Sequence, residues 1–435
     1  MWEWRGPATI LPQFSNKDSP LLLNAQDCAA LDQTTSALAD FAAWRSAFAP
    51  GPEGTLYFDA NSIGPMPVDA PARMQHVLDA GWRQARRRGW SELDWLQQPA
   101  SLGAAIAPLL GADAADVRVC DTTSINQYKL LCFALSRAAP RRVIVLEQDV
   151  FPSNRYVAEG IAKSGLAELR FIRHADELPA ALAGQDVAVV ALSHVDYRTS
   201  ARHDMAALTR LAHDHGALAL WDLSHSAGAV AIELKAAQAD LAVGCGYKYL
   251  CGGPGAPAYL YVNAQLQGAH WPALAGWMGH ADTFAFEPGY RPAPGPDRFL
   301  VGTPAVLANV AFSAAADIWR RVSPAALDAR HRSLTDTLIQ LLDEQCSPLG
   351  ISLASPRSHA QRGGHVALQF DGAAPLSQAM VARGVVVSSR KPDALRFGVH
   401  PLTTTHADLW RAVQILRDLL DSGDWRDPRF NGPVI

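Results

Sequence analysis

The stretch Asp240-Leu-Ala-Val-Gly-Cys-Gly-Tyr-Lys248-Tyr-Leu-Cys-Gly-Gly-Pro-Gly255 places a single lysine inside an apolar, glycine-rich run. We expect residues 243–250 to form a short buried strand, because the segment after them is too rich in glycine and proline for a helix. Burying an ammonium group is costly, and the usual escape is a lowered pKa or a covalent bond. A neutral amine can form a Schiff base with an aldehyde. The glycines are expected to let a flat ring lie close to the backbone.

A second stretch, Trp221-Asp222-Leu-Ser-His225-Ser-Ala-Gly228, puts an aspartate at the end of an apolar run that begins at Ala217. A carboxylate near a Schiff-base lysine is what pyridoxal 5'-phosphate (PLP) requires, because it keeps the ring nitrogen protonated and the ring an electron sink. Asp222 and Lys248 together therefore predict PLP as the cofactor. Gly252-Gly-Pro-Gly255 lacks the GxGxxG spacing of a dinucleotide loop.

Length and composition fit a globular enzyme. The chain has 435 residues, a net charge of −4 and 49% hydrophobic residues, which predicts two domains and argues against a nucleic-acid or membrane-surface role. We find no apolar run near the roughly twenty residues that span a bilayer, and no signal-peptide pattern at the start. Six cysteines without a CxxC pair predict reduced thiols and a cytoplasmic location. The spacing of His213-Asp-His215 does not suit metal ligands on one helix face, so no metal is expected.

Strand-like apolar runs alternate with amphipathic helices over the middle of the chain. This predicts an α/β fold whose large domain has a mostly parallel, seven-stranded sheet covered by helices. The expected strands begin near residues 117, 143, 169, 186, 217, 241 and 258, and the expected helices span 124–137, 155–164 and 205–215. Strands at 364–370, 385–388 and 395–398 predict a small C-terminal α/β domain. The expected division is 1–60, a segment that packs on both domains, 61–305, the large PLP-binding domain, and 306–435, the small domain.

Polar and aromatic residues follow several of the expected strands. Ligands bind beyond the carboxyl ends of the strands in parallel α/β sheets. Thr123 and Ser124 stand at a helix start, where hydroxyls and free N–H groups can hold a phosphate. The other candidates at strand ends are Phe151, Asn154, Ser193, Asp222, His225 and Lys248.

These motifs resemble those of kynureninases, PLP enzymes of aminotransferase fold type I and the class V family. The resemblance runs from Tyr57-Phe-Asp-Ala-Asn61-Ser-Ile-Gly64 to Arg396-Phe-Gly-Val-His-Pro401, which is most of the chain. Its most specific parts are residues 222–228, 244–257 and Gly276-Trp-Met-Gly-His280.

The resemblance implies a role for each matching residue. Lys248 would be the Schiff-base lysine, Asp222 would pair with the ring nitrogen, and Tyr247 would exchange protons in the last steps. Arg396 would bind the substrate α-carboxylate with its two-pronged guanidinium. The remaining cofactor residues would be Thr123, Ser124, Phe151, Asn154, Ser193, His225, Tyr247, Trp277 and Thr303, and the remaining substrate residues Asn61 and Trp90.

The resemblance also implies the reaction and the assembly. The reaction is the hydrolytic cleavage of the Cβ–Cγ bond of L-kynurenine or 3-hydroxykynurenine, which gives L-alanine and anthranilate or 3-hydroxyanthranilate. The small-molecule substrate would be bound by a homodimer with shared active sites, in which Trp277 and Thr303 reach the cofactor phosphate of the neighbouring subunit.

The sequence departs from the family pattern at several positions. Asn154 stands where Asp is usual, Ser200 where Gly is usual, and Cys251 where Asn is common, and the segment before Leu31 is longer than typical. Restoring the acid at residue 154 is predicted to tighten PLP retention, unless the amide donates a hydrogen bond that a carboxylate cannot. These departures favour, as an alternative, a paralogue that acts on a ring-substituted kynurenine.

Two other classes of function stay open at this stage. One is a different PLP enzyme of the same fold, such as a β-lyase, an aminotransferase or a cysteine desulfurase. A desulfurase needs a catalytic cysteine on a mobile loop, and Cys346 lies in a helix-like segment. The other is a non-catalytic binding protein that keeps the fold, which the presence of Lys248, Asp222 and Arg396 together disfavours.

Overall fold

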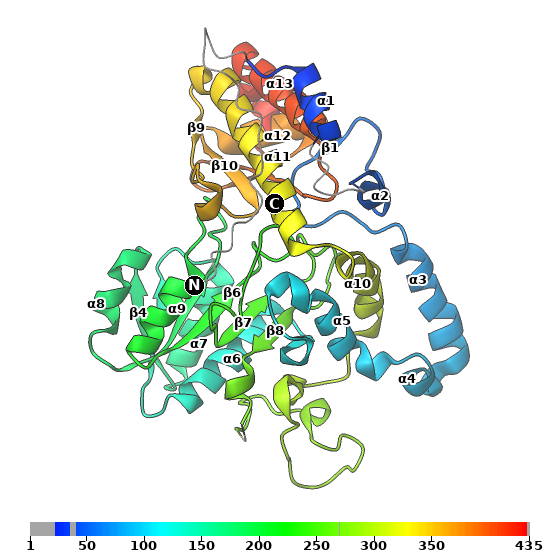
Figure 1. The fold of residues 1–435 in the computed structure, drawn as a ribbon, viewed down its shortest axis with the longest axis vertical. Helices are drawn as coiled ribbons and strands as arrows, with labels where there is room; N and C mark the ends of the chain where they lie inside the picture. Colours follow the sequence, from blue (N-terminus) through cyan, green and yellow to red (C-terminus); the bar gives the residue numbers. More distant parts are fainter. Residues whose placement is uncertain (1–21, 35–40, 269, 433–435) are drawn as a thin grey trace, which may run out of the picture.

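The computed structural model describes residues 22–34, 41–268 and 270–432. Most of the N-terminal extension predicted before Leu31 therefore lies outside the described residues. A large sheet-containing part carries a smaller part above it in Figure 1. Within the described ranges, no helix is long and apolar enough to cross a membrane.

The central sheet has seven strands in the order β2-β8-β7-β6-β5-β3-β4. The strands are β2 (Val117–Val119), β3 (Val143–Glu147), β4 (Glu168–Ile172), β5 (Val187–Ser193), β6 (Leu218–Asp222), β7 (Leu241–Gly244) and β8 (Tyr259–Val262). The pairs that link β4, β3, β5, β6 and β7 are parallel, whereas β8 runs antiparallel to both β7 and β2. The predicted seven-stranded, mostly parallel sheet is confirmed.

Burial explains why this sheet forms where the sequence predicts it. All seven residues of β5 are buried, and a continuous apolar run is what a parallel strand covered on both faces requires. One buried apolar cluster brings α6 (Thr123–Arg137) and α7 (Pro152–Lys163) against the sheet. A second cluster brings α5 (Gln98–Ile106), α9 (Met205–Asp214) and α10 (Val306–Trp319) against it.

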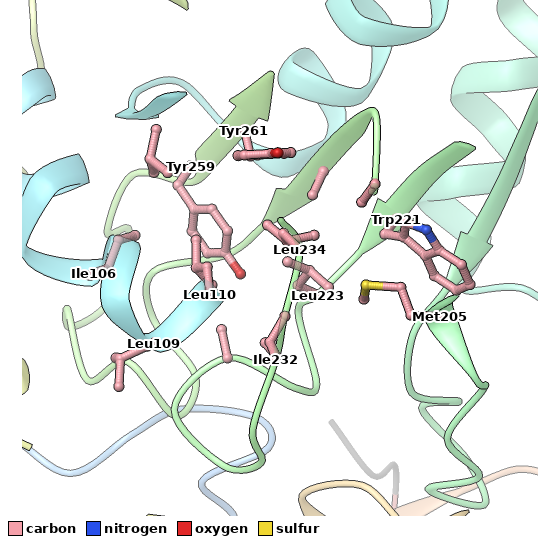
Figure 2. Packing of buried hydrophobic residues seen from close by; sticks show 14 of the residues in the cluster. Ile106, Leu109, Leu110, Met205, Trp221, Leu223, Ile232, Leu234, Tyr259 and Tyr261 are labelled. Carbon is pink, nitrogen blue, oxygen red and sulfur yellow. The ribbon is translucent and has the colours of Figure 1, made fainter. Parts of the chain in front are cut away.

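Large side chains fill the second of these clusters (Figure 2). Trp221 of β6 and Tyr259 of β8 are at most 1% exposed. The indole Nε1 of Trp221 donates to Thr209 Oγ1 at 3.0 Å, which satisfies its one polar atom. Because Trp221 directly precedes Asp222, this packing fixes the end of β6 from which the carboxylate projects.

The smaller part has its own sheet and its own buried cluster. The strands are β9 (Ser352–Leu353), β10 (His365–Gln369), β12 (Ser388–Arg390) and β13 (Ala394–Gly398), in the antiparallel order β12-β13-β10-β9. The helices α11 (Pro324–Gln345), α12 (Ala373–Ala382) and α13 (His406–Ser422) cover it, and α1 (Ala25–Thr34) packs on α13. The strand expected at 385–388 is two strands, since β11 (Val385–Val386) pairs with β1 (Leu56–Tyr57) and β12 pairs with β13.

Three short helices lie on the right in Figure 1, two beside the large part and one above them beside the smaller part. They are α2 (Phe41–Ser46), α3 (Ala70–His76) and α4 (Gly89–Glu92). α10 packs against α3 and α5, so the first helix after residue 305 contributes to the core of the large part.

The strand predicted at residues 243–250 is wrong beyond its first two residues. β7 ends at Gly244, and Lys248 lies in the loop that follows. Two glycines of this loop, Gly246 and Gly252, leave room for neighbouring parts of the protein. A Cβ on Gly246 would lie 2.9 Å from the ring of Phe312, and one on Gly252 would lie 2.8 Å from Ala256 Cβ.

Replacing Gly246 by alanine should destabilise the protein by about 1–3 kcal/mol, since the added methyl group would overpack the contact with Phe312 and Pro257. Gly160→Ala is the matched control. Gly160 lies within α7 with no atom near its virtual Cβ, and alanine is the better helix former by roughly 0.5–1 kcal/mol. Denaturant unfolding of both variants measures the difference. Equal stability of the two would contradict the packing role of Gly246.

Candidate active site

A cavity of about 540 Å³ opens where β5, β6 and β7 end and α6 and α7 begin. It lies at the carboxyl edge of the parallel strands, as α/β sheets require. The predicted site residues that line it are Thr123, Ser124, Phe151, Asn154, Ser193, Asp222, His225, Tyr247 and Lys248. Predicted residues from five separate stretches of the sequence therefore converge at one place.

The N-terminus of α6 forms one end of the cavity. The helix starts one residue earlier than expected, at Thr123, and Thr122 is its N-cap, whose side chain accepts from the N–H of Ile125 at 3.3 Å. Thr123 and Ser124 therefore occupy the first turn, where N–H groups lack intrahelical acceptors. Hydroxyls and free N–H groups at a helix N-terminus suit a phosphate.

Lys248 points at a histidine. Its Nζ lies 2.9 Å from His225 Nε2 and 5.7 Å from the centroid of the Phe151 ring. Burial lowers the pKa of Lys248, and the positive charge of Arg396 lowers it further, whereas Cys245 and Asp222 act in the opposite direction. Within the described part of the chain, no carboxylate forms an ion pair with this amine. The pair therefore favours a neutral, nucleophilic amine.

The ring of His225 is neutral, and its Nε2 shares a hydrogen bond with the amine of Lys248. Burial, and then the neighbouring charge of Lys248, hold the pKa of His225 well below its usual value of 6.5. The other ring nitrogen, Nδ1, is buried and has no hydrogen-bond partner among the described residues. A buried polar atom of this kind is costly and fits a site that a ligand completes.

Asp222 is held from two sides at the end of β6. Its Oδ1 accepts from the N–H of Ser224 at 2.9 Å, and its Oδ2 accepts from Asn154 Nδ2 at 2.7 Å. A carboxylate with both oxygens engaged has a fixed orientation, and the face turned to the cavity remains open to a donor. A protonated ring nitrogen is such a donor.

The sequence interpretation missed several residues of the cavity wall. The most informative is Tyr197, which lies against Phe151 in an edge-on contact with 5.3 Å between ring centroids. Val195 and Tyr197 follow the end of β5, so their position after Ser193 was the available signal. Cys245 and Ser224 also line the cavity. Burial raises the pKa of Tyr247, so its hydroxyl stays protonated.

Arg396 does not line the cavity, although it lies behind one of its walls. Its guanidinium is 1% exposed and donates to the Tyr197 carbonyl at 2.6 Å and to Ser388 Oγ at 3.0 Å. Its Nε has no partner among the described residues. Burial, and then the charge of Arg390, lower the pKa of Arg396 to about 10.

Four other predicted residues also lie away from the cavity wall of this chain. Asn61 is 1% exposed, and both polar atoms of its side chain lack partners within the described ranges. Trp90 of α4 packs edge-on against Trp95, with 5.2 Å between ring centroids. Trp277 is 43% exposed, and Thr303 lies in an exposed loop. The structure of one chain does not bring these four together with Lys248.

Two of the departures from the family pattern have left-handed backbones. Ser200 has a φ of +62° and Cys251 a φ of +59°. Glycine and asparagine adopt this region more easily than other residues do, which explains the family's choice there. Ser200 offsets the strain in part, because its Oγ accepts from the N–H of His365 at 3.2 Å.

The cavity fits PLP by the chemistry of its walls. One end offers the hydroxyls and N–H groups of α6, the middle offers the ring of Phe151, and the far end offers the carboxylate of Asp222. Lys248 supplies the amine that an aldehyde needs, and the free Nδ1 of His225 supplies an unused polar atom.

Comparison with known proteins decides the family. A kynureninase from Pseudomonas fluorescens is 43% identical over 411 residues, which cover 93% of this chain and 97% of the relative. The chain belongs to the kynureninase family. A kynureninase from Burkholderia pseudomallei strain 1106a is 42% identical over 385 residues, covering 87% of this chain and 92% of the relative. The model of the kynureninase C-terminal domain matches residues 327–416. Kynureninases are PLP-dependent hydrolases that cleave carbon–carbon bonds, and this chain is such an enzyme.

Solved structures share the fold of this kynureninase family member. The cysteine desulfurase CsdA from Escherichia coli superposes with a TM-score of 0.72 at 19% identity, covering 88% of this chain and 99% of that one. A mutant of C-DES, solved with glycine covalently linked to its PLP cofactor, gives a TM-score of 0.72 at 20% identity, covering 86% of this chain and 98% of that one. The predicted fold type I architecture is confirmed.

Acid should destabilise this protein between about pH 6.5 and pH 4.5. Burial is the main cause that lowers the pKa of seven histidines, which are His194 (to about 3), His225, His270, His331 (to about 3), His365, His400 (to about 4) and His406. The unfolded chain then binds more protons than the native one, so stability falls as the pH falls, by up to about 1.4 kcal/mol per pH unit for each histidine. His203 and His213, whose pKa values are raised, act in the opposite direction.

Chemical denaturation as a function of pH measures this slope. His331→Gln should reduce it, whereas the change His174→Gln at an exposed position should leave it as it is. A free energy of unfolding that stayed constant across this window would show that the buried histidines take up protons without unfolding.

Proposed function

We propose that the protein hydrolyses the Cβ–Cγ bond of L-kynurenine or 3-hydroxykynurenine to L-alanine and the matching anthranilate, with Lys248, Asp222 and Tyr247 as its catalytic residues. The main support is the amine of Lys248, which faces a neutral histidine in the cavity and has no ion pair in the described part of the chain. Family membership supports the reaction.

The residues around the cavity divide between cofactor and substrate. Thr123 and Ser124 would hold the phosphate of PLP, Phe151 would lie on its ring, and Asp222 would face the ring nitrogen. Ser193, Asn154 and His225 would complete this shell. Arg396 is a buried cation that forms no ion pair within the described residues, which supports its role as the partner of the substrate α-carboxylate.

PLP, when bound, supplies an aldehyde for amine exchange and a ring that takes up electrons. The amine of Lys248, whose pKa burial lowers, would remove the proton at the substrate Cα. Asp222 would hold a proton on the ring nitrogen. Tyr247, whose hydroxyl stays protonated, would deliver a proton to the substrate Cβ as the Cβ–Cγ bond breaks. Water adds to the γ-carbonyl, and its oxygen becomes part of the carboxyl group of the aryl product. One water is therefore consumed per turnover.

The alternative of a cysteine desulfurase fits the structure poorly. Cys346 is the C-cap of α11, is fully buried, and belongs to the apolar cluster of the smaller part. Burial raises the pKa of its thiol to about 12. An inert thiol in a core cannot serve as the nucleophile of a mobile loop.

We also propose a homodimer with shared active sites. Exposed aromatic side chains on the segment after β8 support this assembly. Trp277 is 43%, Phe284 57% and Phe286 78% exposed, and the rings of Trp277 and Phe284 touch edge-on at 6.0 Å. An exposed apolar surface of this kind is suited to a protein partner. In such a dimer, Trp277 and Thr303 would complete the phosphate site of the neighbour. Asn61 and Trp90 would line the substrate pocket.

The division of the chain and its location complete the proposal. We propose a segment 1–60, a large domain 61–305 and a small domain 306–435. The separate apolar clusters of the two parts support two domains, but α10 packs in the cluster of the large part, so the clusters do not support the boundary at residue 305. Six unpaired cysteines support a cytoplasmic location.

Incubation with L-kynurenine and with 3-hydroxykynurenine tests the proposed reaction. The expected products are alanine and anthranilate or 3-hydroxyanthranilate, and the ratio of the two kcat/KM values gives the ring preference. Formation of an α-keto acid with no alanine would point to an aminotransferase and would refute the proposal.

Lys248→Ala should abolish turnover and the borohydride-reducible bond between PLP and the protein, because Lys248 is the only lysine among the described residues that line the cavity. Mass spectrometry of the reduced, digested protein locates the modified lysine. Exposed Lys163→Ala is the control and should keep full activity. A PLP adduct on another lysine at normal rates would move the assignment elsewhere.

Mixed dimers test the shared site. Lys248→Ala subunits and Trp277→Ala/Thr303→Ala subunits should each be impaired alone. After subunit exchange, one site in each mixed dimer has all its residues intact, so activity should return to at most about one quarter of the parent value. Activity that does not return on mixing, or a fully active monomer in sedimentation at assay concentration, would rule out sharing.

A further inference from the structure

Asn154 lies within hydrogen-bonding distance of Asp222, the only aspartate among the described residues that line the cavity. It stands in the first turn of α7, where its backbone N–H donates to the Phe151 carbonyl at 2.9 Å. Its side chain is 4% exposed, and its Nδ2 donates to Asp222 Oδ2 at 2.7 Å. A carboxylate only accepts, so the nitrogen of the amide must be the atom that faces it.

A second buried amide holds the backbone of this residue. Gln127 of α6 is 1% exposed, and its Nε2 donates to the carbonyl of Asn154 at 3.1 Å. The resulting chain Gln127–Asn154–Asp222 joins three elements that border the cavity, since α6 also carries Thr123 and Ser124. These two hydrogen bonds hold the first turn of α7 against α6 and against the end of β6.

At 2.7 Å from Asp222, an amide and a carboxyl group at residue 154 differ in their ability to donate a hydrogen bond. An amide N–H is a donor at every pH. Two carboxylates at hydrogen-bonding distance repel unless one of them takes up a proton. With the acid that is usual in the family, the ring end would hold two carboxyl groups and a shared proton. With Asn154 it holds one carboxylate, which has a permanent donor on each oxygen, from Asn154 and from Ser224.

We propose that Asn154 is a positioning residue, whose amide holds Asp222 as the sole carboxylate at the ring end of the cavity and orients it toward the cofactor's ring nitrogen. On this view, the amide at residue 154 has a function of its own as a hydrogen-bond donor to Asp222, and the missing carboxylate is not simply a defect. This inference rests on the proposed function only in requiring that PLP binds in this cavity. It reverses the expectation that an acid at residue 154 tightens PLP retention.

PLP binding to the apoprotein tests the inference without turnover. Quenching of tryptophan fluorescence gives the affinity, and the visible absorbance of the bound cofactor between pH 5 and pH 9 gives a protonation profile. Asn154→Asp should weaken PLP binding and add a pH-dependent step that the parent protein lacks. Asn154→Ala should weaken binding by roughly ten- to hundredfold, the usual effect of losing a hydrogen bond to a charged group, and should add no such step.

A swap of the two side chains provides the rescue. Asp222→Asn leaves two amides, whereas Asn154→Asp/Asp222→Asn restores one acid and one amide in exchanged places. The double variant should bind PLP more tightly than Asp222→Asn alone, because the coupling belongs to the pair. Asn263→Asp is the matched control. Asn263 also donates through its Nδ2 to a carbonyl, that of Ala239 at 3.0 Å, but lies outside the cavity wall, and this change should leave the PLP affinity unaltered.

Three results would overturn the inference. They are PLP affinity in Asn154→Asp equal to or tighter than in the parent, affinity in Asn154→Ala equal to that of the parent, and a double variant no better than Asp222→Asn. The Ala variant decides the question if the Asp variant does not fold. A parent protein that binds PLP but does not cleave kynurenine refutes the proposed function and leaves the inference intact. A parent protein that does not bind PLP refutes both.

Discussion

The desolvated amine of Lys248 is the constraint on which the rest of the site depends. An ammonium group in this cavity would pair readily with a carboxylate, and a tight ion pair would keep it protonated. In the structure the amine meets His225 instead, and the oxygens of Asp222 accept from Asn154 and Ser224. A neutral amine and a carboxylate can then coexist in one cavity.

The topology of the sheet supplies these groups from distant parts of the chain. β5, β6 and β7 are neighbours and run in parallel, so their carboxyl ends lie at one edge. The residues just beyond them are Ser193, Asp222 and the loop of Lys248. The antiparallel strand β8 follows that loop and returns the chain through the sheet, and its tyrosines, Tyr259 and Tyr261, pack in the apolar core of Figure 2.

Three of the predicted site residues carry buried polar atoms without partners among the described residues. The side-chain amide of Asn61, the Nε of Arg396 and the Nδ1 of His225 are all buried without partners among the described residues. Each such group typically costs about 1–3 kcal/mol relative to a paired one. Apolar side chains would be more stable in these places, and polar ligands that complete the hydrogen bonds explain why the protein retains them.

The sequence by itself determined the class of fold and the central chemistry. Continuous apolar runs such as residues 187–192 can only be buried strands, and a lysine and an aspartate at the ends of such runs indicate a PLP site without coordinates. Local patterns carry this information because burial and chain direction depend on neighbours in sequence. The end of the Lys248 strand was predicted wrongly, and the close contacts of Gly246 with Pro257 and Phe312 leave no signal in the local sequence.

The tertiary structure alone decided how the groups act on one another. The contact between Asn154 and Asp222 joins residues 68 positions apart, and nothing in either local stretch says that the amide donates to that carboxylate. The left-handed backbone of Ser200 and the burial of Arg396 behind Tyr197 are likewise products of long-range packing. Hydrogen-bond geometry and desolvation act over a few ångströms in space, whatever the separation along the chain, so only the folded protein fixes the charge state of the site.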